Sequence, residues 1–167
     1  NRQGLETIVS GATELSSQHS LSTYSQSVLA QLRTLISDDI SAVFCARGQG
    51  IIENIDDLSF YVLAQMGFDD NLINQKIDTL QDHQASKQVK ACYLQQKHQY
   101  LDDSLNLYVA KGDYRAVIHV KIASPLTEIQ TQLLNVFLTG VAVGYENVHL
   151  FQKLTNAAYR DWLTNLP

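Results

Sequence analysis

The side chains of this sequence that can do chemistry are few and widely spaced. Metal-spaced histidine and cysteine sets, a glycine-rich phosphate loop and the motifs H-E-x-x-H and G-x-S-x-G are all absent. Covalent catalysis needs a nucleophile with a base in reach, and only Cys45 with His119 offers such a pair. The sequence therefore predicts no metal site and favours a non-catalytic domain, with a Cys45 and His119 enzyme as the alternative. The histidines are scattered along the chain, at His19, His83, His98, His119 and His149.

The composition is that of one ordinary globular domain. The chain has 167 residues, of which 45% are hydrophobic and 17% charged, enough for a core of its own. The net charge of −5 and the lack of a lysine or arginine cluster argue against nucleic-acid binding. Cys45 and Cys92 fall in apolar or helical patterns, which predicts buried thiols in a reducing compartment. No apolar run approaches the roughly 20 residues of a membrane span and no signal peptide is evident, so we expect a cytoplasmic protein without a membrane partner.

Apolar periodicity divides the chain into helices and strands. Residues 40–46 form a continuous apolar and β-branched run, as in a central strand. Residues 105–110 and 114–122 alternate in character around a turn at 111–113, as in an antiparallel hairpin. The other expected elements are helices over 2–15 and 21–36, a second strand over 58–67, a short helix or loop over 69–80, a helix over 84–96 and a long helix over 125–163.

This order of elements predicts an α+β fold. Antiparallel strands lie in the middle of the chain, and helices gather at both ends. We therefore expect one sheet with helices on one face and with the terminal helices close together.

The long helix is the element around which the others are arranged. Pro125 suits its first turn and Ser124 its N-cap. A heptad repeat of apolar residues runs through it, so we expect its first half to pack on the domain and its second half on the same helix of a second copy. Gly140 and Gly144 would let another backbone come close, either in a dimer or where a core helix crosses the sheet, and both readings stay open. The predicted dimer seam consists of Leu133, Val136, Gly140, Val143, Asn147, Leu150 and Leu154, with Asn147 able to fix the register.

Three stretches of the chain resemble a known family. They are LETIVSGATEL near the start, the strand that ends in Cys45-Ala46-Arg47-Gly48, and GVAVGYENVHLFQKL in the long helix. They resemble domain-of-unknown-function family 3369, a GAF-like module of bacterial response regulators that lies between a phosphoryl-accepting receiver and a cyclic-di-GMP enzyme. The resemblance implies a GAF- or PAS-like antiparallel sheet flanked by helices, with a long C-terminal signalling helix.

The last residues, 161–167, read D-W-L-T-N-L-P and look like the opening of a GGDEF diguanylate cyclase domain, with Asn165 where glycine is more usual. We therefore expect one GAF-like regulatory domain over 1–160 and the start of the next domain over 161–167. Since the chain begins at Asn1 and ends within this motif, we expect a piece of a longer protein. The GGDEF motif itself and the residues that hydrolyse cyclic-di-GMP are absent, so this chain is not expected to make or cleave that dinucleotide.

The resemblance also implies where a small molecule would bind, because GAF-like folds hold ligands between the sheet and the helices over it. A ligand is not required, and a cofactor stays unknown, with haem the weaker idea. Arg47 at the mouth of an apolar strand suits a carboxylate or phosphate; in the alternative it pairs with Glu53 or Asp57, and the tyrosines keep their hydroxyls in water. The candidate ligand residues are Arg47, Tyr61, Tyr93, Tyr108 and His119.

These expectations combine into one functional prediction. The chain is expected to be a sensory or relay domain of a cyclic-di-GMP signalling protein, working as a homodimer through its terminal helices. The alternatives are a small-molecule-binding enzyme on the same fold, and a structural spacer that dimerises without a ligand.

Overall fold

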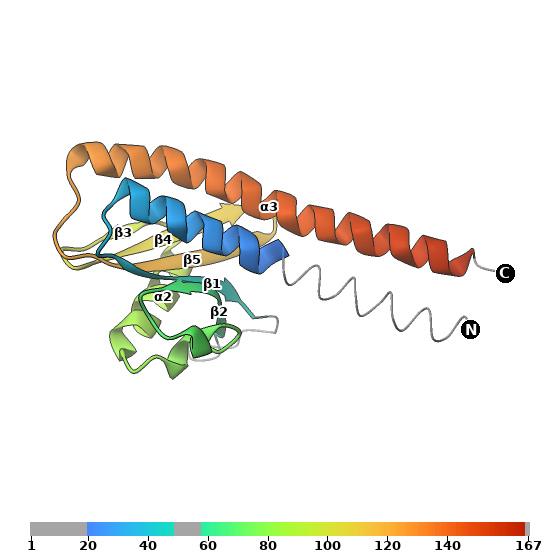
Figure 1. The fold of residues 1–167 in the computed structure, drawn as a ribbon, viewed down its shortest axis with the longest axis horizontal. Coiled ribbons are helices and arrows are strands. Elements are labelled where there is room, and N and C mark those ends of the chain that lie inside the picture. Colours follow the sequence, from blue (N-terminus) through green and yellow to red (C-terminus); the bar gives the residue numbers. More distant parts are fainter. Residues whose placement is uncertain (1–19, 49–57, 166–167) are drawn as a thin grey trace.

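The computed structural model describes residues 20–48 and 58–165. The predicted helix over 2–15 and the acids Glu53 and Asp57 lie outside these residues. A single antiparallel sheet forms the centre of the molecule, with strand order β2-β1-β5-β4-β3 (Figure 1). Its strands are β1 (Ser41–Arg47), β2 (Phe60–Met66), β3 (Gln99–Tyr100), β4 (Ser104–Lys111) and β5 (Tyr114–Lys121).

Helices cover both faces of this sheet. One face is covered by the helix whose described part spans residues 20–35 and by α3 (Glu128–Thr164). The opposite face is covered by α2 (His83–Gln95) and by two 3-10 turns, η2 (Asp70–Leu72) and η3 (Ile77–Thr79). The α+β fold is confirmed, but the prediction of helices on one face is wrong.

The burial pattern of β1 explains why two faces need cover. Ala42 and Phe44 belong to the core beneath α3, while Val43 and Cys45 belong to the core beneath α2. Because successive side chains of a strand point to opposite faces, an unbroken apolar run requires a layer on each side. β5 is buried in the same way from Ala116 to Val120.

The edge strand β2 changes face at a bulge. Phe44 pairs with Ala64 and Cys45 pairs with Val62, so Leu63 is the additional residue on this strand. A bulge of this kind shifts the alternation by one residue. As a result Val62 packs beneath α2, whereas Ala64, although two residues later, packs beneath α3.

The long helix α3 starts later than predicted. Thr127, not Ser124, is the N-cap: its Oγ1 accepts a hydrogen bond from the backbone of Gln130 at 3.1 Å, and the Gln130 side chain accepts one from the backbone of Thr127 at 3.0 Å. This reciprocal capping box fixes the start of the helix, so Pro125 lies before it. From there α3 continues for 37 residues and ends at Thr164.

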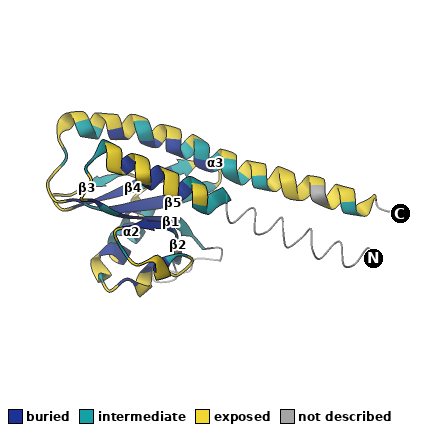
Figure 2. Ribbon diagram, viewed as in Figure 1, coloured by how far each residue is buried: buried dark blue, intermediate teal, exposed yellow. Residues whose placement is uncertain are grey.

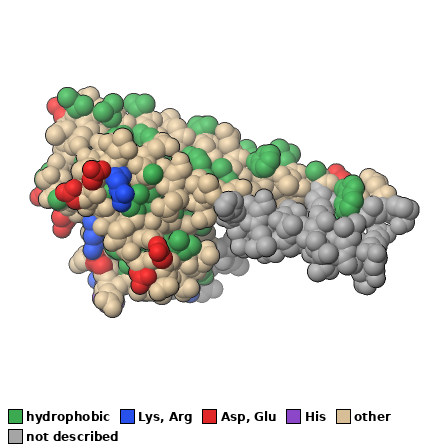
Figure 3. Space-filling view, viewed as in Figure 1, with side chains coloured by type: hydrophobic (Ala, Val, Ile, Leu, Met, Phe, Trp, Pro, Cys, Tyr) green, Lys and Arg blue, Asp and Glu red, His purple; other side chains and the backbone are tan. Residues whose placement is uncertain are grey.

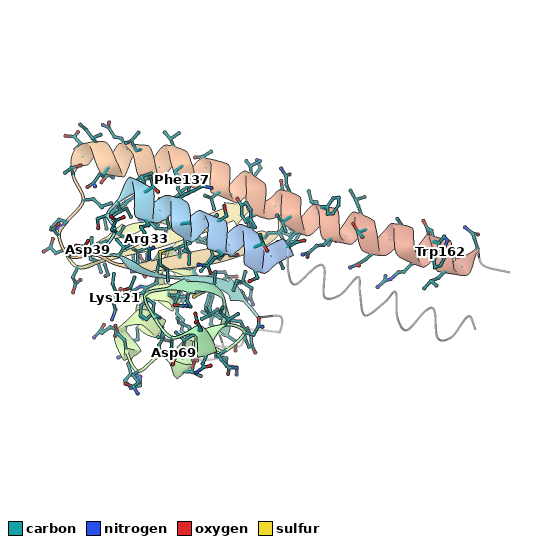
Figure 4. The ribbon with its side chains drawn as sticks, in the orientation of Figure 1. Arg33, Asp39, Asp69, Lys121, Phe137 and Trp162 are labelled. Carbon is teal, nitrogen blue, oxygen red and sulfur yellow. The ribbon has the colours of Figure 1, made fainter. Side chains whose placement is uncertain are left out.

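The far part of α3 leaves the domain (Figures 1 and 2). Figure 4 places Phe137 on the part that covers the sheet and Trp162 close to the far end. The core face of α3 consists of Leu134, Leu138, Val141 and Tyr145, all buried. The first half of α3 therefore packs on the domain, as predicted, but through residues outside the predicted heptad seam.

The helix over residues 20–35 packs beside α3, and a glycine permits the contact. The Tyr24 hydroxyl donates a hydrogen bond to the carbonyl of Val141 at 2.8 Å. A Cβ atom added to Gly144 would lie 2.1 Å from that hydroxyl oxygen. Gly144 is thus required for the close approach of these two helices.

Candidate functional site

Three of the five predicted ligand residues meet on the sheet face beneath α2. Arg47, at the end of β1, donates a hydrogen bond from Nη1 to the hydroxyl of Tyr93 on α2 at 2.7 Å. The Tyr93 ring meets the edge of Tyr108 with ring centroids 6.5 Å apart, and it meets Phe60 at 5.3 Å. Burial raises the pKa of the Tyr108 hydroxyl. Arg47, Tyr93 and Tyr108 therefore form one amphipathic cluster near the end of β1.

Tyr61 does not belong to this cluster. It lies on the edge strand β2, is 36% exposed, and its ring lies against Gly48. A Cβ atom at Gly48 would approach that ring to 2.5 Å. Tyr61 therefore covers the end of β1 and has a packing role.

His119 lies further along β5, in a buried polar network of its own. Its Nδ1 donates to the side-chain oxygen of Asn106 at 2.7 Å, and Asn106 donates to Gln88 on α2 at 3.0 Å. Burial lowers the pKa of His119 to about 4, so the ring is neutral at pH 7. Its Nε2 is buried without a hydrogen-bond partner, at the wall of a cavity of about 660 Å³ that Asp82 and Lys121 also line.

The environment of Cys45 does not favour catalysis. Cys45 is wholly buried, and burial raises the pKa of its thiol, so the reactive thiolate is suppressed. Across the β1 and β5 pair, Cys45 faces Val117, whereas His119 faces Val43. Cys92, the second thiol, is buried too, and its pKa is raised to about 12. These observations speak against the alternative of an enzyme built on Cys45 and His119.

A second cavity, of about 510 Å³, lies where α3 leaves the sheet, and it contains residues that the sequence reasoning missed. Arg47 and Tyr93 line one side of it, and the start of β5 and one face of α3 line the other. The residues from these two elements are Tyr114, Arg115, Tyr145, His149, Gln152, Lys153 and Asn156, and Asp113 from the turn before β5 also lines this side. The spacing of Tyr145, His149 and Lys153, four residues apart on a helix, was the signal that could have indicated a common face.

Aromatic stacking joins β5 to α3 on one side of this cavity. The ring of His149 lies parallel to that of Tyr114, with centroids 4.3 Å apart and an angle of 8°. Tyr145 meets the same histidine ring edge-on at 4.6 Å, and the ammonium of Lys153 lies over the Tyr114 ring at 5.5 Å from its centroid. We call this space, between the end of β1, the start of β5 and α3, the root cavity.

The predicted dimer seam lies on the solvent side of α3. Its large apolar members are exposed, by 54% at Leu133, 75% at Val136 and 70% at Leu154. Val143 and Leu150, at 41% and 42%, continue the same line, as do Ile129 and Phe151. Figure 3 shows apolar side chains along this helix. We call this face the α3 stripe; Gly140 and Asn147, also exposed, belong to it.

The two glycines of α3 occupy different surroundings. Gly144 meets Tyr24, whereas a Cβ atom at Gly140 would have no atom of the described part of the chain within 4 Å. The reading of a core helix crossing its own domain therefore accounts for Gly144 and leaves Gly140 unexplained.

Two classes of site find no support among the described residues. Within 20–48 and 58–165 no group of three or more histidine, cysteine, aspartate or glutamate side chains is placed to hold a metal ion. No helix in the same part of the chain has the length and apolar character to cross a membrane.

Comparison with known proteins shows the family and the fold. Residues 1–154 match the family described as Domain of unknown function (DUF3369), and no match is found among curated proteins. The crystal structure of the GAF domain from Acinetobacter phosphoenolpyruvate-protein phosphotransferase is similar, with a TM-score of 0.53 and 10% identity over 91% of this chain and 97% of that chain. At this identity the likeness concerns the fold alone, which is GAF-like. The chain belongs to the DUF3369 family.

Proposed function

We propose that this chain is a non-catalytic, cytoplasmic signal-relay domain that pairs with a second copy through the α3 stripe and transmits a signal along α3. The observation that carries the proposal is the exposure of this stripe. Seven large apolar side chains of one helix, from Ile129 to Leu154, are between 41% and 75% exposed. A continuous exposed apolar surface of this kind marks an interaction site in a soluble protein.

The stripe has the chemistry of a helix-to-helix contact. Full burial of one Leu or Val side chain contributes about 1.5–3 kcal/mol, so several such side chains on each copy can offset the entropy of association. Gly140 lies in the middle of the stripe, where the absence of a side chain serves no contact with residues 20–48 or 58–165. Asn147, further along, suits a register-fixing pair at the centre of a seam.

The geometry of α3 supports a relay role. One face of its first half is buried against the sheet and the stripe lies on the opposite side, so a movement of the sheet is passed to any helix paired with the stripe. The likeness of residues 161–167 to the start of a GGDEF domain suggests a diguanylate cyclase as the output, with a receiver upstream, as in the bacterial response regulators that contain domains of this family. The root cavity favours a sensing domain over a purely structural spacer.

The oligomeric state of two matched variants tests this proposal. Val143→Lys with Leu150→Lys places two charges on the stripe, and Leu94→Lys with Leu101→Lys replaces two side chains of similar exposure, 48% and 43%, elsewhere on the surface. In sedimentation or light scattering we expect a dimer for the native chain and the control, and a folded monomer for the stripe variant. A native chain that stays monomeric at high concentration would refute pairing through α3.

A further inference from the structure

The root cavity gathers positive charge in a protein that is acidic overall. The chain carries a net charge of −5 and only 12 lysines and arginines, yet Arg47, Arg115 and Lys153 line this one cavity. Asp113, on the hairpin turn, is the single acid among its lining residues, and the carboxylate of Glu146 lies close to Gly112 of that turn. The local charge is therefore opposite in sign to that of the whole molecule, which favours an anion.

The recorded contacts of two of these cations are with neutral groups. Arg115 donates from Nη1 to the carbonyl of Tyr114 at 3.0 Å and also to that of Gly112. Lys153 lies over the ring of Tyr114. Such contacts orient both positive groups. Asp113 offsets part of the Lys153 charge, and the remaining positive charge suits a phosphate or a carboxylate.

Two buried polar side-chain atoms lie at the same place. Nε2 of His149 is buried without a hydrogen bond to any described residue, and the buried hydroxyl of Tyr114 has the ammonium of Lys153 beside it. A buried polar group without a full set of hydrogen bonds is destabilising, so a group from outside the chain that bonds to it is favoured. The rings of Tyr114 and His149 stack in parallel, and both residues line the cavity.

From this convergence we infer that the root cavity binds a small anion, through a phosphate or carboxylate group held by Arg115 and Lys153 and hydrogen-bonded by Tyr114 and His149. Its volume of about 510 Å³ is within the range of small-molecule sites. The bound anion joins the hairpin to α3 at the point where the helix leaves the domain. Binding does not depend on pairing of the α3 stripe.

NMR titration tests this inference with two probes. Sodium phosphate represents a free or substituted phosphate group, and sodium benzoate represents an aromatic carboxylate. We expect saturable shifts of the backbone amides of Tyr114, Arg115, His149 and Lys153 with at least one probe, and sodium chloride at equal ionic strength should not reproduce them. Saturation by phosphate alone assigns a phosphate ligand, and tighter binding of benzoate assigns an aromatic carboxylate.

A charge-matched pair of variants separates a specific site from general attraction. Arg115→Gln with Lys153→Gln should weaken binding about tenfold or more, because charge-assisted contacts are lost. Lys87→Gln with Lys97→Gln removes the same charge at exposed positions outside the cavity and should leave the affinity unchanged. No saturable shift with either probe, or equal loss in both variants, overturns the inference. The titration is repeated on Val143→Lys with Leu150→Lys, in which binding should persist, so that failure of the pairing proposal is distinguished.

Discussion

The substitution Gly144→Ala should destabilise the fold, although it replaces a poor helix former by the best one. The added Cβ atom would lie 2.1 Å from Oη and 2.7 Å from Cζ of Tyr24. These distances are far below van der Waals contact, so the Tyr24 ring has to move away from α3. Its hydrogen bond to the carbonyl of Val141, 2.8 Å long, is then lost.

The expected magnitude follows from three contributions. Loss of the Tyr24 hydrogen bond costs about 1 kcal/mol, and displacement of the packed ring costs about 1–3 kcal/mol. Replacing a helical glycine by alanine returns about 1 kcal/mol. We therefore expect Gly144→Ala to lower the free energy of unfolding by about 1–3 kcal/mol.

Gly140→Ala is the matched control, since it makes the same change one turn earlier. A Cβ atom there has no neighbour within 4 Å, so within one copy only helix propensity changes, and the free energy of unfolding should rise by about 0.5–1 kcal/mol. Urea unfolding of both variants in the Val143→Lys with Leu150→Lys background removes any contribution from pairing.

Equal stabilisation of the two alanine variants would contradict a clash of Gly144→Ala with Tyr24. A double-mutant cycle sharpens the result: Tyr24→Phe removes the nearest clashing atom, so it should cost less free energy in the Gly144→Ala protein than in the native one. Equal costs would mean that Tyr24 and Gly144 are not coupled.

Two further predictions concern the start of α3 and the buried histidine. Thr127→Ala removes the capping box and should cost about 1 kcal/mol in urea unfolding, whereas Thr139→Ala, at an exposed position in the same helix, should cost nothing. Because the pKa of His119 falls from 6.5 to about 4 on folding, the unfolded chain binds more protons between these values, and stability should decrease by up to roughly 3 kcal/mol as pH falls through this window. His119→Gln should remove that share of the pH dependence; His98 and His149, whose pKa values burial also lowers, remain in both proteins. An unchanged slope in His119→Gln would show that the ring is not held neutral by burial.

The sequence was most informative where one periodicity dominated. The heptad pattern located the exposed apolar members of α3, and the hairpin at 105–122 was found because its turn residues are distinctive. It was less informative where a residue pattern allows two environments. An unbroken run such as residues 40–46 does not tell whether a second layer covers the sheet, so α2 was predicted as a helix but its face was missed.

The candidate site shows a further limit of sequence reasoning. Arg47, Tyr93 and Tyr108 were predicted together and lie together, but His119 was grouped with them and belongs to a separate network. The position of a residue along a strand predicts the face of the sheet to which its side chain points. It does not predict how far that side chain lies from one on another strand. Tyr114 and His149 were missed because their contact joins two elements that are far apart in the chain, and no local pattern encodes such a contact.

The far end of α3 has a thermodynamic consequence. Beyond Leu150 nearly every described side chain is exposed, including Phe151 at 67% and Trp162 at 46%. A helical segment of about 15 residues whose side chains are mostly exposed gains little from packing and lies near the balance between helix and coil in water. Amide hydrogen exchange should therefore become steeply faster towards the end of α3. The number of turns that remain helical depends on what packs against their apolar side.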